Sequence, residues 1–382
     1  MGSSPLPGNP YSKSYKTPAQ QVALLQQRGL DVSDSGLAQA CLERIGYYRL
    51  SGYWYPFRKS RLGVNPVNGP PLIDPATRKQ QIIVEDDFRA NSSFRQVMDL
   101  YVFDKRLRLI LLDAIERIEV ALRVDVALLL GQRSPYAHRD PSELDSVFTK
   151  RPSGHQKWLD RLDESFRKSR EEFVTHFKAK YFGQLPPIWI AIELWDFGML
   201  SVLLEGLKPA DKTTLAQKYG LPRSSLLVSF ARNINNVRNI CAHHSRLWNR
   251  SPADRIAPPR PGEIPGLDHL AVDVNAYSRL YATIAVLQHF LLIINPSTRW
   301  SQRLCTHLKT LPAGNNISLT QAGFPVGWER LPLWKNVQWS QQIHDAVANR
   351  AFYLWEDRGK PEGQPDEDWF RAEHEIQSLP SI

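Results

Sequence analysis

The chain has 382 residues, of which 42% are hydrophobic and 23% are charged, and its formal net charge is +9. This length can bury a large core, as one large domain or as two, and the composition is ordinary for a soluble globular protein. No stretch approaches about 18 uncharged apolar residues, so no membrane span is expected. The first ten residues lack the basic and apolar regions of a secretory signal.

The three cysteines, Cys41, Cys241 and Cys305, lie far apart and show no CxxC spacing. This argues against a disulfide framework or a structural zinc site, and it favours a reducing cytoplasm. The net charge is unevenly spread, because residues 356–375 carry eight acids and three bases, a net charge of −5. Since the whole chain is +9, the remainder is +14. Such a basic body is typical of a protein that binds nucleic acid or another polyanion, or simply of a basic soluble protein.

Residues 1–15 are rich in Pro, Ser and Gly, and we expect them to be disordered. Thr17 is the predicted cap of a helix over 18–28, and Ser33 that of a helix over 36–45. Together with the aromatic-rich segment 46–57, they form a small N-terminal module, residues 16–60. Except for a short strand at 81–85, almost no alternating strand pattern follows.

Ser93 and Gln96 form a capping-box pattern that opens a long helix, predicted to end at Gly131. Its middle is apolar nearly all round, and these charged residues are placed on its other faces: Asp99, Asp104, Arg108, Glu116, Glu119 and Arg123. Further helices are predicted at 155–181, 188–195, 197–207, 212–219, 223–246, 273–294 and 340–355. The predicted class is therefore all-α, with a helical bundle (90–300), a C-terminal helical extension (301–355) and an acidic tail (356–382).

The helix predicted to run through residues 232–250 separates its residues by chemistry. At 3.6 residues per turn, one stripe holds Asn235, Asn239, His243, Arg246 and Arg250. The opposite side holds Phe230, Ile234, Val237, Cys241 and Trp248, with His244 among them. Because no acid and no lysine occurs over 232–250, the polar stripe is predicted to meet an anion.

Arg238 and His243 have side chains suited to RNA cleavage without a metal ion. A histidine can take the proton from a ribose 2′-OH, and an arginine can stabilise the charge on the attacked phosphate. DNA lacks this hydroxyl and would not be cut. The two residues are five apart, about 140° around a helix, so we expect a second copy to complete the site across a two-fold axis.

Several alternatives remain open at this point. His244 can be a core histidine, and His243 can be buried and bonded to Asn239. Asn235 and Asn239 can simply bond backbone groups. Cys241 and His243 point apart with no carboxylate nearby, which disfavours a metal site; no metal or cofactor is expected. Tyr48 and Arg49, in the aromatic segment, can stack and hold RNA bases or can belong to a packing cluster.

Residues 238–243 match the Arg-polar-x3-His pattern of the HEPN superfamily, with Asn239 in the polar position. Longer segments resemble the bacterial abortive-infection Abi proteins of the D/F type, and they are residues 46–57, 100–108, 115–123, 186–189 with 193–201, and 237–250. This resemblance covers about residues 15–300. It implies a HEPN helical bundle, a toxin-like RNase in phage defence, a homodimer, and in some relatives a structured noncoding RNA as partner.

The predicted function is therefore an endoribonuclease of an abortive-infection system. His243 would be its general acid or base, Arg238 would bind the phosphate, and Asn239 would orient His243. The expected RNA contacts are Arg246, Arg250, Asn235, Tyr48 and Arg49. The alternative is a module that binds a structured noncoding RNA without cutting it, and a third, weaker possibility is a protein-interaction scaffold.

Overall fold

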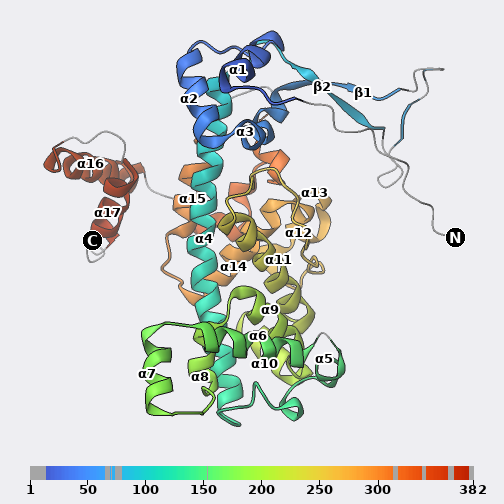
Figure 1. Cartoon of the computed structure of the whole chain (residues 1–382), viewed down its shortest axis with the longest axis vertical. Coiled ribbons are helices and arrows are strands. Elements are labelled where there is room, and N and C mark those ends of the chain that lie inside the picture. Colours follow the sequence, from blue (N-terminus) through green and yellow to red (C-terminus); the bar gives the residue numbers. More distant parts are fainter. Residues whose placement is uncertain are drawn as a thin grey trace.

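The computed structural model describes residues 14–64, 69, 71–73, 80–152, 154–312, 317–337, 341–359 and 365–377. Within these ranges the chain forms seventeen α-helices and a single two-stranded sheet, which confirms the all-α prediction. Figure 1 shows one long helix, α4, along the longest axis of the molecule, with most other helices beside it. The predicted disorder of residues 1–15 lies almost entirely outside the described residues.

The N-terminal module holds α1 (Pro18–Gln27), α2 (Ser35–Ile45) and α3 (Tyr47–Trp54). Thr17 caps α1 as predicted, in a reciprocal capping box with Gln20. The cap of α2 is Asp34 and not Ser33, because the Asp34 carboxylate accepts a hydrogen bond from the backbone N–H of Leu37 at 2.8 Å. The strands are β1 (Arg58–Leu62) and β2 (Ile82–Phe88), paired antiparallel.

The long helix α4 (Phe94–Gly131) begins at the predicted Ser93–Gln96 capping box and ends at the predicted residue. Its 38 residues span roughly 57 Å at 1.5 Å per residue. It contacts the N-terminal module through α3 and the rest of the bundle through α8, α9, α11, α14 and α15. Because one helix touches all these elements, it positions them relative to one another.

The segment after α4 contains short helices, and one predicted helix is divided in two. The helix expected over 155–181 breaks into α6 (His155–Lys168) and α7 (Glu172–Lys180). The Ser169 hydroxyl accepts from the backbone N–H of Glu171 at 3.2 Å, which stabilises a local turn against the helix. The others are α5 (Ser146–Lys150), α8 (Ile188–Ala191), α9 (Phe197–Gly206) and α10 (Pro209–Lys218).

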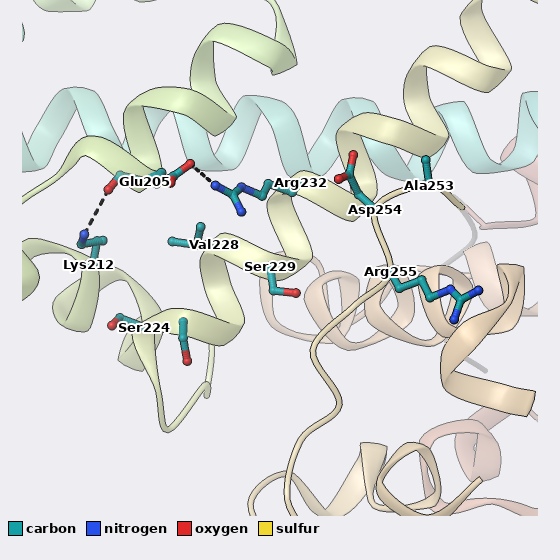
Figure 2. A pocket seen from close by; sticks show the side chains of 10 residues that line it. Glu205, Lys212, Ser224, Val228, Ser229, Arg232, Ala253, Asp254 and Arg255 are labelled. Atoms are coloured by element: carbon teal, nitrogen blue, oxygen red, sulfur yellow. Dashed lines mark hydrogen bonds and ion pairs between the residues drawn. The ribbon is translucent and has the colours of Figure 1, made fainter. Parts of the chain in front are cut away.

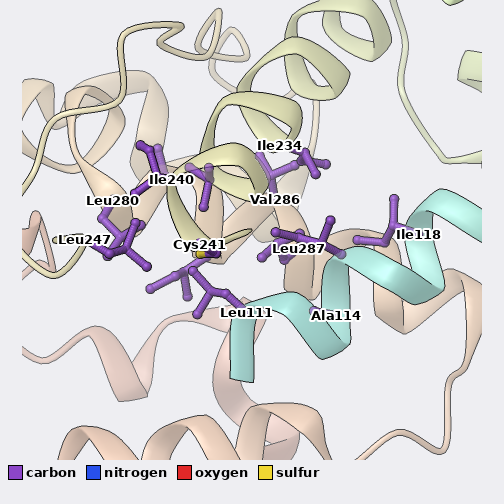
Figure 3. Packing of buried hydrophobic residues seen from close by; sticks show 14 of the residues in the cluster. Leu111, Ala114, Ile118, Ile234, Ile240, Cys241, Leu247, Leu280, Val286 and Leu287 are labelled. Carbon is purple, nitrogen blue, oxygen red and sulfur yellow. The ribbon is translucent and has the colours of Figure 1, made fainter. Parts of the chain in front are cut away.

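Helix α11 (Ser224–Ala242) and α14 (Leu280–Ile294) pack on α4 to form the centre of the core. Figure 3 shows this packing, with Cys241 of α11 facing Leu111 of α4. The predicted helix 273–294 is interrupted at Arg279, whose extended backbone separates α13 from α14. The remaining helices are α12 (His269–Val272), α13 (Val274–Ser278) and α15 (Trp300–Leu308).

The C-terminal segment forms a helical hairpin of α16 (Gln341–Asp357) and α17 (Pro365–Gln377). Its buried hydrophobic residues form a small cluster of their own, separate from the main core, and they are Val347, Ala351, Leu354 and Ala372. Arg358 lies 3.2 Å from Glu367 and 2.6 Å from Asp368, so an ion pair joins the two helices. Residues predicted only as an acidic tail therefore contain a second helix that packs on the predicted one.

His138 is a buried titratable residue in the main core. It is fully buried, and neither of its ring nitrogens has a hydrogen-bond partner in the described part of the chain. Its ring centroid lies 6.1 Å from that of Trp195 and 6.4 Å from that of Trp158. This burial lowers the pKa of His138 to about 3, so the imidazole is neutral in the folded protein.

We expect His138 to make the folded state sensitive to acid. Because its pKa is lowered on folding, its contribution is complete above about pH 6.5 and is lost as the pH falls toward 3. Between pH 7.5 and 5.5, the free energy of unfolding should fall by about 1.4 kcal/mol more in the wild type than in His138→Leu. Urea unfolding at the two pH values measures this difference, and equal losses would contradict it.

Candidate functional site

The candidate site lies where α11 ends, one turn earlier than predicted. The helix stops at Ala242, and His244 has a left-handed backbone with a φ of 55°. The N–H of His244 donates to the carbonyl of Cys241, and the N–H of Ser245 donates to that of Ile240, both at 3.0 Å. This is a Schellman turn, which closes helices most often at a glycine or asparagine.

The predicted helical stripe is therefore wrong beyond His243. Arg246 and Arg250 follow the turn and do not continue the row formed by Asn235 and Asn239. The placement of His244 on the apolar side is also wrong, because the left-handed turn leaves its side chain exposed. A histidine in this conformation carries little sequence signal, since non-glycine residues adopt it seldom.

A buried carboxylate on α4 holds the turn that follows α11. Asp104, fully buried, accepts from the backbone N–H of Trp248 at 2.7 Å and of Leu247 at 3.1 Å. It also accepts from the Tyr53 hydroxyl at 2.7 Å and from Arg108 Nη1 at 2.5 Å. Arg108 Nη1 in turn donates to the Ser245 carbonyl at 3.2 Å.

Asp104 and Arg108 are thus structural groups, although their sequence pattern placed them on faces of α4 away from the core. Burial raises the pKa of Asp104, while Arg108, Tyr53 and the two backbone N–H groups favour its charged form. Removing either partner would leave a buried charge uncompensated. The network joins α3, α4 and the turn after α11 into one rigid unit.

Helix α3 makes two further contacts with the turn. Arg49 Nη1 donates to the His244 carbonyl at 2.6 Å, and Arg246 Nη1 donates to the Gly52 carbonyl at 2.7 Å. The Arg246 side chain is half-buried, so part of its guanidinium is committed to the fold. Tyr48 stands beside Arg49 and is 92% exposed. The aromatic segment therefore divides between core residues, such as Tyr53 and Trp54, and exposed rings, Tyr48 and Tyr55.

His243 is exposed, and in the described residues its ring forms no hydrogen bond and no ion pair. The expected hydrogen bond from Asn239 to His243 is not formed. Instead, the Asn239 side-chain oxygen accepts from Arg238 Nη1 at 3.3 Å. Arg238 and Asn239 are half-buried, and Arg250 is exposed. The predicted catalytic residues thus lie in the last turns of α11 and at its C-cap, where the imidazole is exposed and the guanidinium is half-buried.

The face of α11 that bears Arg238 is not free of acids in space. The Arg238 charge lowers the pKa of Glu119 on α4, although burial, the larger effect, keeps that pKa raised. Glu119 lies 2.5 Å from Arg123, which also donates to the Trp195 carbonyl. The absence of acids from residues 232–250 therefore does not make this face of α11 free of negative charge, because α4 supplies Glu119.

The first turns of α11 contain further partners that the sequence pattern did not reveal. Arg232 forms an ion pair with Glu205 at the end of α9. Asn235 lies at the start of α9, where a Cβ added to Gly198 would be 3.8 Å from its side-chain amide. Asn235 thus packs within the bundle, half-buried.

A cavity of about 540 Å³ lies at the opposite end of α11 (Figure 2). It is lined by residues from α9, α10, the first turns of α11 and the loop at 253–255. Lys212 Nζ donates to the Glu205 carbonyl at 3.0 Å, and the Glu205 carboxylate pairs with Arg232. Two of the cationic side chains that line the cavity are therefore already bound to Glu205. Arg232 and His243 are eleven residues apart, roughly 16 Å along the helix, so the candidate site is separate from this cavity.

The geometry defines a helical protein in which an exposed histidine follows α11 directly and precedes a turn held by the Asp104 network. A family model described as "Abi-like protein" matches residues 40–249, more than half of the chain, and the chain belongs to this family. A model described as a protein of unknown function (DUF2934) matches residues 342–378, the C-terminal hairpin. Neither the curated proteins nor the solved structures contain a significant match.

The Abi-like match runs from α2 to the residue after Trp248. It therefore includes α3, α4, α11 and every member of the Asp104 network. Membership in this family supports a role in abortive-infection phage defence in general. No helix among the described residues is long and apolar enough to cross a membrane. Those residues also contain no cluster of three or more His, Cys, Asp or Glu side chains that could hold a metal ion.

Proposed function

We propose that the chain is a metal-independent endoribonuclease of an abortive-infection system. The observation that carries this proposal is the exposed His243 ring, which has no partner in the described residues and is followed by a turn fixed on the Asp104 network. Arg238, on the same helix, is free of ion pairs in the part of the chain that is described. The match of residues 238–243 to the HEPN pattern and the Abi-like family support the same activity.

In the proposed reaction, His243 takes the proton of a ribose 2′-OH, and the oxygen attacks the adjacent phosphorus. The bond from phosphorus to the 5′-oxygen breaks, and that oxygen takes a proton from an imidazolium, which a second copy's His243 supplies. Arg238 stabilises the negative charge that develops on the phosphate oxygens. The products are a 2′,3′-cyclic phosphate and a free 5′-hydroxyl.

The surrounding residues take different parts in this proposal. Arg250 is exposed and binds a flanking phosphate, and Tyr48 offers an open ring on which an unpaired base can stack. Arg49 and Arg246 shape the turn through their backbone contacts and leave only part of each guanidinium for RNA. Asn239 holds Arg238 rather than His243.

The experiment is cleavage of RNA by the purified protein in excess EDTA. We expect cleavage to persist without metal and to leave 2′,3′-cyclic phosphate ends, which resist periodate until the cyclic phosphate has been opened to a monoester and then removed. An oligonucleotide with a single 2′-deoxyribose at the cleaved position should resist, because the attacking hydroxyl is absent. Cleavage of this oligonucleotide at that position, or a requirement for metal, would contradict the mechanism.

One observation favours the second candidate, a module that binds a structured noncoding RNA without cutting it. The His243 ring has no residue to orient it among the described residues, and a general base usually has one. Sequencing of RNA that co-purifies with the protein tests this candidate. A single defined species, retained equally by His243→Ala, would favour binding over cleavage.

A further inference from the structure

The loop between α7 and α8 carries four large apolar side chains that the fold leaves open to solvent. Phe182 is 94% exposed, Trp189 is 52% exposed, and Tyr181 and Leu185 are each 41% exposed. We name these four residues the α7–α8 tip. Residues 181–189 contain no Asp, Glu, Lys or Arg, so the tip is uncharged throughout. An exposed apolar patch with a polar border is typical of an interaction surface.

A tight turn places Phe182 at the end of this loop. The N–H of Gln184 donates to the carbonyl of Tyr181 at 3.0 Å, which closes a four-residue turn. Gly183 occupies its third position with a φ of 76°, a conformation that favours glycine. The loop is fixed further along at Ile188, which is fully buried and whose N–H donates to a carbonyl of the chain after α4 at 2.8 Å. Phe182 is therefore exposed on a turn whose base is anchored.

An aromatic cluster separate from the main core supports the tip. The Phe177 ring centroid lies 6.1 Å from that of Phe166 and 5.0 Å from that of Tyr181. Val174 and Phe177 are the buried residues of α7, and neither belongs to the main hydrophobic cluster. Changes to the exposed side chains of the tip should therefore leave the main core intact.

Basic side chains lie next to the tip. Residues 150–182, which include α6 and α7, carry nine Lys or Arg and five Asp or Glu, a net charge of +4. Lys178 Nζ lies 4.8 Å from the ring centroid of Phe166, and Lys180 Nζ lies 5.4 Å from that of Tyr181. Arg170 and Lys180 are exposed, and neither forms an ion pair in the described residues. The surface thus joins an uncharged apolar end to a cationic border.

This combination fits a membrane surface better than a nucleic acid. Exposed apolar and aromatic side chains enter the boundary between headgroups and acyl chains, and anionic lipid attracts the cations beside them. A site for single-stranded RNA would instead place cations among its stacking rings, where they meet the phosphates. Here the cations end at Lys180, and Leu185 offers no ring on which a base can stack.

The tip lies at the far end of α4 from the candidate site. A Cβ added to Gly131, the last residue of α4, would lie 3.6 Å from the Trp189 ring, so the two lie side by side. Asp104, which holds the turn after α11, is 27 residues earlier, roughly 40 Å along the helix. Figure 1 likewise shows α7 and α8 at the opposite end of the molecule from α3. A membrane bound at the tip therefore leaves the candidate site in water.

We propose that the α7–α8 tip binds the surface of a membrane that contains anionic lipid. Phe182 and Leu185 enter the headgroup boundary, and Arg170 and Lys180 contact the lipid phosphates. The inference goes beyond the proposed function, because it uses no residue of the candidate site. It gives the protein a peripheral position, in which the Gly131 end of α4 faces the lipid.

Co-sedimentation of the full chain with sucrose-loaded vesicles tests this proposal. The vesicles contain phosphatidylethanolamine with phosphatidylglycerol, and vesicles of phosphatidylcholine alone serve for comparison. We expect Phe182→Ser to lower the partition coefficient on the anionic vesicles by about tenfold or more, because the burial of a whole phenylalanine side chain is lost. Lys180→Glu should lower it by about the same factor on the anionic vesicles and have little effect on phosphatidylcholine.

Two substitutions at exposed positions on other elements are matched controls. Val326→Ser removes an apolar side chain that is 95% exposed, and Lys309→Glu reverses an exposed lysine at the end of α15. Both variants should bind the anionic vesicles like the wild type. All four variants should melt like the wild type, because each change is at an exposed side chain.

A wild type that stays in the supernatant with both kinds of vesicle would overturn the proposal, as would binding that Phe182→Ser and Lys180→Glu leave unchanged. If vesicles are not bound and Phe182→Ser instead weakens binding of single-stranded RNA, the tip is a nucleic-acid surface. RNA cleavage by Phe182→Ser in solution should equal that of the wild type. Because cleavage and vesicle binding are measured separately, the membrane proposal and the proposed nuclease can each fail alone.

Discussion

Substitution of His243 by alanine should reduce RNA cleavage by about 10²- to 10⁴-fold, the usual contribution of a general acid or base. The residue is exposed and its ring makes no contact that the fold requires in the described residues, so the variant should fold and melt like wild type. The rate is measured on a fluorescent RNA oligonucleotide in EDTA. RNA affinity, measured by fluorescence anisotropy, should change by less than about threefold.

The neighbouring histidine offers a matched control. His244→Asn removes a second exposed ring but keeps the left-handed backbone, which asparagine tolerates. This variant should cleave within a few-fold of wild type. Full activity of His243→Ala would remove His243 from the mechanism, and loss of activity only in His244→Asn would assign the chemistry to the other ring.

The largest expected effect on stability comes from Asp104. Asp104→Ala would leave the nearly buried Arg108 guanidinium without its partner, together with the backbone N–H groups of Leu247 and Trp248. Breaking a buried ion pair in this way costs about 3–5 kcal/mol, a large share of the 5–15 kcal/mol that stabilises a typical domain. Urea unfolding at pH 7 measures the loss.

Asp99 serves as the comparison on the same helix. It also pairs with an arginine four residues away, Arg95, at 3.0 Å, but that pair is exposed. Asp99→Ala should therefore cost less than about 0.5 kcal/mol. If the two alanine variants lose similar stability, the Asp104 network does not hold the turn.

Local sequence signals predicted the long elements of the fold well. The Ser93 capping box and Gly131 marked both ends of α4, and the Thr17 cap marked the start of α1. Interruptions within helices were missed where they depend on one side chain or one backbone angle. Ser169 divides α6 from α7 through its own hydroxyl, and His244 ends α11 without a glycine.

The sequence predicted those residues of the site that lie together on one helix, but not their partners on other helices. Residues 238–243 lie on one helix end, so their neighbourhood could be anticipated from spacing. The partners of that helix end come from distant segments. Asp104 is 144 residues from Trp248 in the sequence. The helical pattern alone does not distinguish this buried acid from the exposed acids on the same long helix. Glu119 likewise approaches Arg238 only because α4 and α11 pack together.

The contacts between α3 and the turn have a consequence for synthesis of the chain. They join Arg49 to His244 and Gly52 to Arg246, across 195 and 194 residues. Contacts this distant in the chain cannot form until the ribosome has released nearly 250 residues. A shorter nascent chain would lack the two hydrogen bonds that join α3 to the turn after His243. Under the proposed nuclease function, the site would therefore stay unformed until about residue 250 has left the ribosome.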